Sequence, residues 1–221
     1  MSIAIVAGVL LVVVFIYYMV TYAKPSDTDG KYVVFDYSIP GDTQQSFPTQ
    51  LPRSNNQAQG MTYSFTSWIL VKDFTKGYGT QRRIFSKNDS PGLYLDSTSN
   101  SLLVKVDTYG TTESILIPDI PAVKWIHFAL VVDQHSVDIY INGLLRKHHT
   151  LGQLPKLNDA VVSIGSVWNG VLARLTYYAR SLSSGEIKKM LNEPLPNDLD
   201  RKASGPNYFD ISWYIGRLYS V

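Results

Sequence analysis

The chain has 221 residues, of which 45% are hydrophobic and 17% are charged, and its formal net charge is +2. So small a charge excludes the strongly basic surface with which proteins release counterions from nucleic acid, so we expect no nucleic-acid partner. The chain contains no cysteine, which excludes a disulfide framework, thiolate catalysis and a cysteine-ligated zinc site.

The first 23 residues form an apolar segment that carries no charged side chain from residue 2 to residue 23. A helix rises about 1.5 Å per residue, so about 20 residues cross the hydrocarbon core of about 30 Å. The sequence therefore predicts one transmembrane helix over residues 1–23. The residues predicted to span the membrane include Ile3, Val6, Leu10, Val13, Phe15, Ile16 and Val20.

Amphipathic residues gather where this segment ends. Tyr17, Tyr18, Tyr22 and Lys24 are predicted to lie at the membrane interface, because tyrosine rings and lysine side chains prefer the headgroup region. A cleaved signal peptide is the alternative, since small residues occupy positions 21 and 23. The missing basic region before the apolar run and the length of that run both argue against cleavage. The positions of the flanking charges leave the orientation in the membrane open.

Residues 24–30 form a short polar linker, and residues 31–193 have the pattern of a β domain. The many Tyr, Phe and Trp side chains beside Val, Ile and Thr favour sheet over helix bundle. Short alternating segments separated by turn signals predict an all-β sandwich. The expected strands are residues 31–37, 63–71, 82–87, 92–96, 102–107, 113–117, 125–132, 137–141, 144–149, 160–164 and 171–178, with a loop over residues 39–60.

Two local signals fix details of this domain. Asn142-Gly143 predicts a tight hairpin turn between two strands. Ser183 followed by Glu186 is a capping-box pattern, so a short helix is expected to begin there and to end before Pro194. Residues 194–221 are expected to form a polar linker and a docking tail.

Two stretches of this domain resemble a known family. Residues 125–133, with Trp125 and His127, lead into a strand that ends in Asn142-Gly143, as in laminin-G-like modules of the concanavalin A-like lectin/glucanase superfamily. Residues 164–187 resemble the closing strand and helix of that family. The resemblance implies a jelly roll of two antiparallel sheets that binds glycans or proteins and, in some members, calcium. Ala173 and Arg174 stand where many relatives carry acidic residues, which argues against such a calcium site.

The residues give no support for catalysis. A retaining glycosidase needs two carboxyl groups about 5 Å apart, and the only glutamates, Glu113, Glu186 and Glu193, are widely separated in the sequence. His127 lies within an apolar strand and is expected in the core. His148 and His149 are adjacent, so on a strand they point to opposite faces and cannot share a metal. We therefore expect neither an enzyme nor a cofactor.

Aspartates in the turns are candidate cation ligands. Turn aspartates usually accept hydrogen bonds from their own backbone, however, so we favour this structural role. Three aromatic residues in expected loops, Trp168, Tyr109 and Tyr78, are candidates for stacking on sugar rings. The C-terminal tail is too apolar to be left in water, so we predict that it docks on this domain or on a neighbour. Its predicted partner-binding residues are Tyr208, Phe209, Trp213, Tyr214, Leu218 and Tyr219.

Together these features predict a non-enzymatic structural protein that a single helix holds at a membrane. The chain resembles minor capsid proteins that link the internal membrane of large icosahedral DNA viruses to the capsid shell, which would place it in the virion. That resemblance implies lipid and neighbouring capsid proteins as partners. A membrane-anchored lectin that binds glycans is the main alternative, and a glycoside hydrolase is a third.

Overall fold

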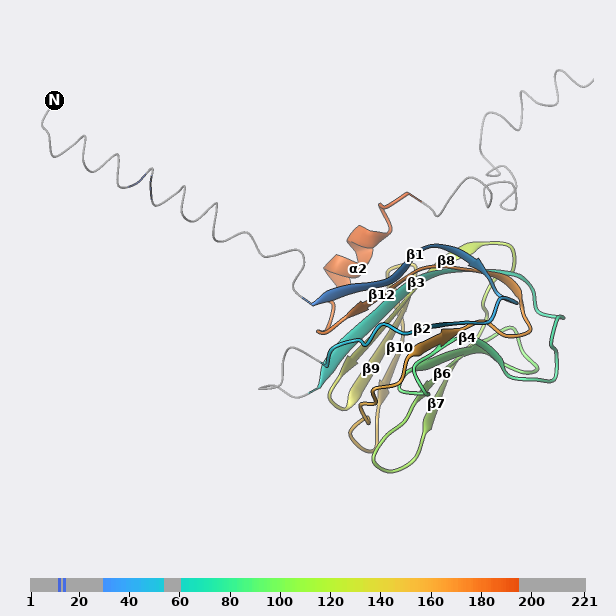
Figure 1. The fold of residues 1–221 in the computed structure, drawn as a ribbon, viewed down its shortest axis with the longest axis horizontal. Coiled ribbons are helices and arrows are strands. Elements are labelled where there is room, and N and C mark those ends of the chain that lie inside the picture. Colours follow the sequence, from blue (N-terminus) through green and yellow to red (C-terminus); the bar gives the residue numbers. More distant parts are fainter. Residues whose placement is uncertain (1–11, 13, 15–29, 54–60, 195–221) are drawn as a thin grey trace, which may run out of the picture. The chain divides into compact units, whose positions relative to one another are not determined.

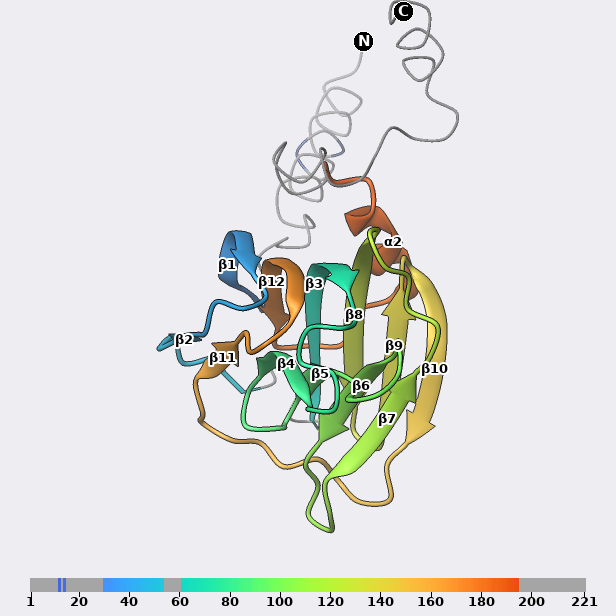
Figure 2. The same ribbon diagram turned by 90° about the vertical axis from the view of Figure 1, so that its right-hand side faces the viewer.

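The computed structural model describes residues 12, 14, 30–53 and 61–194. Two six-stranded sheets pack face to face in this part of the chain, with one short helix beside them (Figures 1 and 2). The predicted all-β sandwich with a short helix is thus confirmed. The strands are β1 (Lys31–Pro40), β2 (Gln45–Phe47), β3 (Thr62–Asp73), β4 (Arg82–Ser86), β5 (Gly92–Leu95), β6 (Leu102–Val106), β7 (Glu113–Ile117), β8 (Trp125–Asp133), β9 (Ser136–Ile141), β10 (Leu144–Thr150), β11 (Val162–Ile164) and β12 (Asn169–Tyr178).

The sheets combine local hairpins with pairings between distant segments. Sheet A has the strand order β1-β12-β3-β8-β9-β10, and sheet B has the order β2-β11-β4-β5-β6-β7. β3 pairs along its length with β8, from Thr62 opposite Asp133 to Leu70 opposite Trp125. The predicted hairpin turn at Asn142-Gly143 joins β9 to β10, and both residues have positive φ. A two-residue turn of this kind matches the twist of the flanking strands.

The core lies between the two sheets. Along β3, Tyr63, Phe65, Ile69 and Val71 alternate with polar or outer residues and belong to the large buried cluster. Successive side chains on a strand point to opposite faces, so this alternation directs one face of β3 toward sheet B. Residues from both sheets complete the cluster, and burial of their apolar surface is the main favourable term in folding.

A second, smaller cluster lies on the outer face of sheet A. It joins Ala129, Val131 and Tyr178 of the sheet to Leu182 and Ile187. Ile187 belongs to α2 (Ser184–Met190), which has the predicted capping box between Ser183 and Glu186. The helix is therefore positioned by its cap and by one apolar side chain that packs on the sheet.

The expected loop over residues 39–60 is partly wrong. β1 continues to Pro40, and β2 occupies Gln45–Phe47. β2 is a three-residue strand in which only Phe47 is buried, and it pairs with β11, more than 100 residues away. A strand this short carries too little periodicity to be detected, and its partner is known only from the fold.

The predicted membrane span cannot be compared with the structure, because of residues 1–23 only Val12 and Val14 are described. Across the described part of the chain, no helix combines the length and the apolarity that a bilayer crossing requires. The span at residues 1–23 and the interface residues Tyr17, Tyr18, Tyr22 and Lys24 stay predictions.

Candidate binding sites

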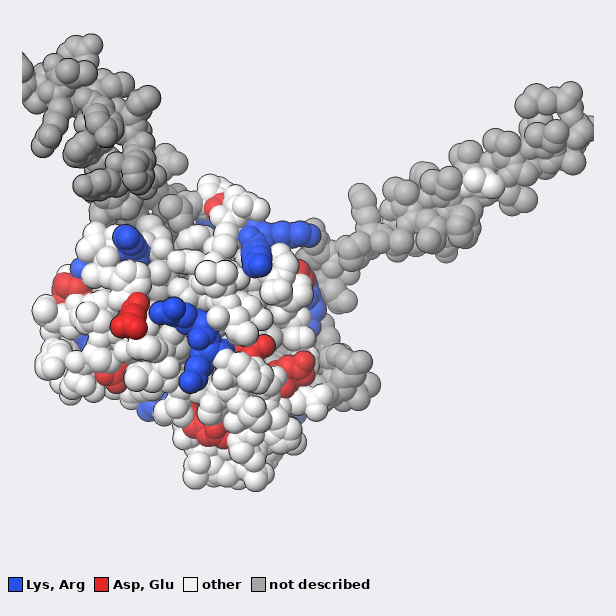
Figure 3. Space-filling model, turned by 180° about the vertical axis from the view of Figure 1, so that it is seen from behind, with Lys and Arg blue, Asp and Glu red and all other residues white. Residues whose placement is uncertain are grey.

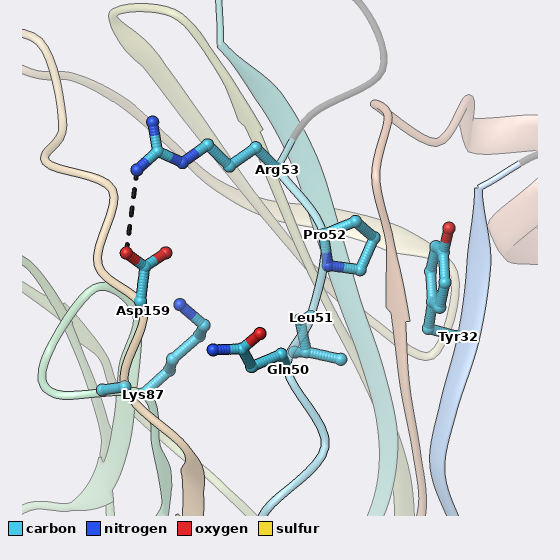
Figure 4. A pocket seen from close by; sticks show the side chains of 8 residues that line it. Tyr32, Gln50, Leu51, Pro52, Arg53, Lys87 and Asp159 are labelled. Atoms are coloured by element: carbon cyan, nitrogen blue, oxygen red, sulfur yellow. Dashed lines mark ion pairs between the residues drawn. The ribbon is translucent and has the colours of Figure 1, made fainter.

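A pocket of about 410 Å³ opens beside β1 and is walled by the segment that follows β2 (Figure 4). This segment is held in place, because the Tyr177 hydroxyl donates a hydrogen bond of 2.8 Å to the Pro52 carbonyl and Leu51 packs against the core. The pocket is lined by Tyr32, Gln50, Leu51, Pro52, Arg53, Lys87, Asp159 and Ala160.

The charged groups of the pocket differ in how well they are paired. Arg53 and Asp159 form an ion pair of 3.7 Å whose side chains are both largely exposed, so the pair adds little stability. Lys87 is only 7% exposed, and its ammonium donates to the backbone and side-chain oxygens of Asn158. No ion pair joins Lys87 to a carboxylate of the described residues. Burial lowers the pKa of Lys87, because an ammonium loses hydration that neutral oxygens replace only in part.

A smaller chamber of about 20 Å³ adjoins the pocket and shares Lys87 with it. Tyr63 lines this chamber, and its buried hydroxyl has no hydrogen-bond partner among the described residues. The neighbouring Ser90 hydroxyl donates to the Lys156 carbonyl instead. Buried polar groups are nearly always paired, so an unpaired hydroxyl beside a cavity is a candidate ligand contact.

A second candidate site is an exposed edge, which we call the β10–α2 edge and define as Leu144, Leu145, Arg146 and Lys147 of β10 with Lys188 and Lys189 of α2. Leu144 and Leu145 are 67% and 53% exposed. The hairpin tip lies against the helix, since a Cβ atom on Gly143 would be 3.2 Å from Lys188 Cγ.

The four cations of the β10–α2 edge form no ion pair with any described residue. Figure 2 places β10 at one side of the sandwich, and Figure 3 looks onto that side, where Lys and Arg side chains gather between separate acidic side chains. This edge therefore combines exposed apolar surface with positive charge.

The described residues contain no group of three or more His, Asp or Glu side chains that could hold a metal ion. The aspartate of one turn behaves as the turn interpretation predicts, since Asp96 accepts hydrogen bonds from the backbone of Thr98 and Ser99. The Ser99 hydroxyl also donates to Asp96, and this bond, together with the backbone bonds, lowers the pKa of Asp96 by stabilising its charged form.

The three glutamates each have a different local role. Glu113 accepts hydrogen bonds from His149 and from the Gly152 backbone, and Glu186 caps α2. Glu193 lies 3.9 Å from Arg174 in a partly exposed ion pair. None of these arrangements is the facing pair of carboxyl groups that glycoside hydrolysis uses.

A family model described as the concanavalin A-like lectin/glucanases superfamily matches residues 42–188. The chain belongs to the concanavalin A-like lectin/glucanase superfamily. Comparison with curated proteins gave no match.

Several solved structures share the fold of this superfamily member at low sequence identity. The binding domain of Paraclostridial Mosquitocidal Protein 1 is 15% identical, with a TM-score of 0.53 over 74% of this chain and 45% of that one. The binding domain of botulinum neurotoxin DC, solved with rat synaptotagmin II, is 14% identical, with a TM-score of 0.54 over 72% and 47%. A botulinum neurotoxin type C structure, whose description states that cell entry depends on two ganglioside molecules, is 14% identical, with a TM-score of 0.51 over 72% and 46%. The chain spans less than half the length of each, so the likeness shows the fold.

The three aromatic residues that the sequence suggests for sugar stacking differ in their exposure to solvent. Tyr78 and Tyr109 are 64% and 70% exposed, so their rings are accessible. Trp168 is only 1% exposed and its proposed sugar stacking is contradicted. A Cβ on Gly41 or Gly170 would lie 2.3 or 2.2 Å from its ring, so the indole occupies the space that these two glycines leave free.

The histidines lie where the sequence predicts. His127 is 2% exposed in β8, and its ring packs edge-to-face with Trp68 at a centroid distance of 5.1 Å. Burial lowers the pKa of His127 to about 4 and keeps the imidazole neutral near pH 7. His148 contacts Asp138 in β9, whereas His149 contacts Glu113 in β7, so the two rings have different partners.

Sequence reasoning missed both the pocket and the β10–α2 edge. Gln50 to Arg53 lie in an expected loop, and Lys87 ends an expected strand without any motif. A signal for the edge is present in Leu144-Leu145 followed by Arg146-Lys147, within the expected strand of residues 144–149. The predicted partner-binding residues of the C-terminal tail, from Tyr208 to Tyr219, lie outside the described residues.

We predict that Trp168→Ala destabilises the domain instead of removing a sugar contact. Deleting a buried indole leaves a cavity and should lower the free energy of unfolding by about 3–5 kcal/mol. Tyr78→Ala, which changes an exposed ring, should alter it by less than about 0.5 kcal/mol. Urea unfolding followed by tryptophan fluorescence and circular dichroism measures both, and equal stability of the two variants would contradict the buried position of Trp168.

Proposed function

We propose that this protein is a non-enzymatic binding protein held at a membrane by residues 1–23. Two of the similar solved structures are binding domains, and the described residues offer no paired carboxyl groups for hydrolysis. The uncharged N-terminal segment has the length of one membrane crossing. These observations together support attachment and binding over catalysis.

We further infer that its partners are capsid proteins and that it is a minor capsid component, which links an internal viral membrane to the capsid shell. The observation that carries this inference is the β10–α2 edge, where Leu144 and Leu145 are both exposed, one on each face of the strand. Large exposed apolar side chains beside charged ones are found at protein contact sites. The apolar C-terminal tail supplies a second predicted contact.

The charges of the edge indicate the kind of contact. Lysine and arginine on an edge strand discourage the addition of a foreign strand. We therefore infer a contact through side chains, in which the leucines are covered and Arg146, Lys147, Lys188 and Lys189 meet acidic groups of the partner.

The membrane span is tested with the full-length chain. Leu10→Arg combined with Val13→Arg places two charges within the predicted span, at a cost of about 2.5–3.5 kcal/mol for each. The wild-type chain should float with liposomes in a density gradient, whereas the double variant should remain at the bottom. Leu10→Ile with Val13→Leu is the matched control. A wild-type chain that stays soluble without detergent and does not float contradicts the anchor.

The capsid proposal is tested in purified virions. The wild-type chain should co-purify with the particles and be released when detergent dissolves the internal membrane. Leu144→Asp with Leu145→Asp should reduce incorporation at least about tenfold, as expected when the centre of a contact site is disrupted. Val33→Asp, at an exposed position on the other edge strand of sheet A, is the control. Absence of the wild-type chain from virions would overturn the proposal.

A membrane-anchored lectin is the second candidate, and the exposed rings of Tyr78 and Tyr109 favour it. Exposed aromatic rings can stack on the apolar faces of sugars. A glycan array probed with the full-length chain should then give reproducible binding that Tyr78→Ala or Tyr109→Ala removes. Tyr37→Ala, at another half-exposed tyrosine, should leave it unchanged. An array without signal contradicts the lectin and leaves the capsid proposal standing.

A further inference from the structure

We propose that the pocket between β1 and the segment 50–53 binds an acidic sugar, a ring that carries one carboxylate. The inference depends on the geometry of the pocket and is independent of the capsid proposal. It also concerns a site that includes neither Tyr78 nor Tyr109.

The first argument is charge. Arg53 and Lys87 bring two positive charges to the pocket and Asp159 brings one negative charge, so the lining residues have a net charge of +1. The exposed pair between Arg53 and Asp159 is long, at 3.7 Å, and can open at little cost. A ligand with a single negative charge therefore neutralises the site.

The second argument is the state of Lys87. Lys87 is only 7% exposed, yet its ammonium contacts only the neutral oxygens of Asn158. Asn158 also donates to the Lys87 carbonyl at 2.8 Å, so the ammonium is held in position by contacts at both ends of the residue. An ammonium has three donors and only two are used here. Hydrogen bonds to a charged partner are the stronger kind, so a carboxylate is the ligand group that gains most at this position.

The third argument is shape. A volume of about 410 Å³ is far larger than a carboxylate and lies within the range of small-molecule sites. The Tyr32 ring and the Pro52 ring provide apolar surface on one side, and the Gln50 amide provides donors and an acceptor on the other (Figure 4). A sugar ring has apolar C–H faces and a rim of hydroxyl groups, and so matches both kinds of lining.

The fourth argument is the unpaired Tyr63 hydroxyl. It lies in the chamber that adjoins the pocket and shares Lys87 with it. The chamber, about 20 Å³, has room for one water molecule, which can relay a hydrogen bond from Tyr63 to the bound anion. The polar side of the pocket is thus built from Lys87, Arg53 and Gln50, with Tyr63 in the adjoining chamber.

The test uses the full-length chain in nanodiscs of zwitterionic lipid, so that the lipid does not attract anions. D-glucuronate, D-glucose and acetate are titrated into it by isothermal calorimetry. Glucuronate should bind saturably, and glucose and acetate should each bind at least about tenfold more weakly, because each lacks one of the two features that the pocket recognises.

Two variants with opposite expected effects identify the site. Arg53→Gln removes an exposed cation and should weaken glucuronate binding about tenfold. Asp159→Asn removes the competing carboxylate and should strengthen binding severalfold. Lys124→Gln is the matched control, because it precedes Trp125, which pairs with Leu70 at the end of β3 remote from Tyr63. Each variant is compared with the wild type by circular dichroism, so that a folding defect is recognised.

Several results would overturn the proposal. Lack of saturable glucuronate binding to the wild-type chain excludes an acidic sugar. Equal affinity for glucuronate and glucose shows that charge is not recognised, and equal affinity for glucuronate and acetate shows that the ring is not. If Arg53→Gln and Lys124→Gln bind glucuronate alike, the ligand lies elsewhere.

Discussion

The burial of β3 on both faces is the constraint on which the rest of this domain depends. Its first ten residues are all buried. One face packs into the core between the sheets, and on the other the Ser64 hydroxyl donates to the Arg180 carbonyl and accepts from the Leu182 backbone. These bonds hold the chain that leads to α2 against the sheet. A strand covered on both sides tolerates no shift of register, because a slip by one residue would exchange its two faces.

The two candidate sites follow from this arrangement but rely on different physics. The pocket lies near the Tyr63 end of β3, where segments distant in the sequence meet and leave Lys87 buried without an ion pair to any described carboxylate. The β10–α2 edge lies at the margin of sheet A, where the core can no longer cover Leu144 and Leu145. An open pocket and an incomplete margin are thus the features on which the proposed small-anion site and the proposed protein contact depend.

Trp168 illustrates how residue type alone can mislead. In the sequence it stands between strands, as a sugar-stacking tryptophan would. In the fold it fills the space above Gly41 and Gly170, which are remote from one another in the chain. Tyr78 and Tyr109 carry the same sequence signal and remain exposed. Only the position of the two glycines distinguishes these cases.

The sequence by itself determined the strands with strong alternation, the Asn142-Gly143 hairpin, the capping box of α2 and the sandwich class, because turns, caps and periodicity are local properties of the chain. The tertiary structure alone decided the pairing of β2 with β11, the burial of Trp168 and the meeting of Arg53, Lys87 and Asp159. These features depend on which distant segments become neighbours, and that outcome is set by packing of the whole core and not by any short stretch of residues.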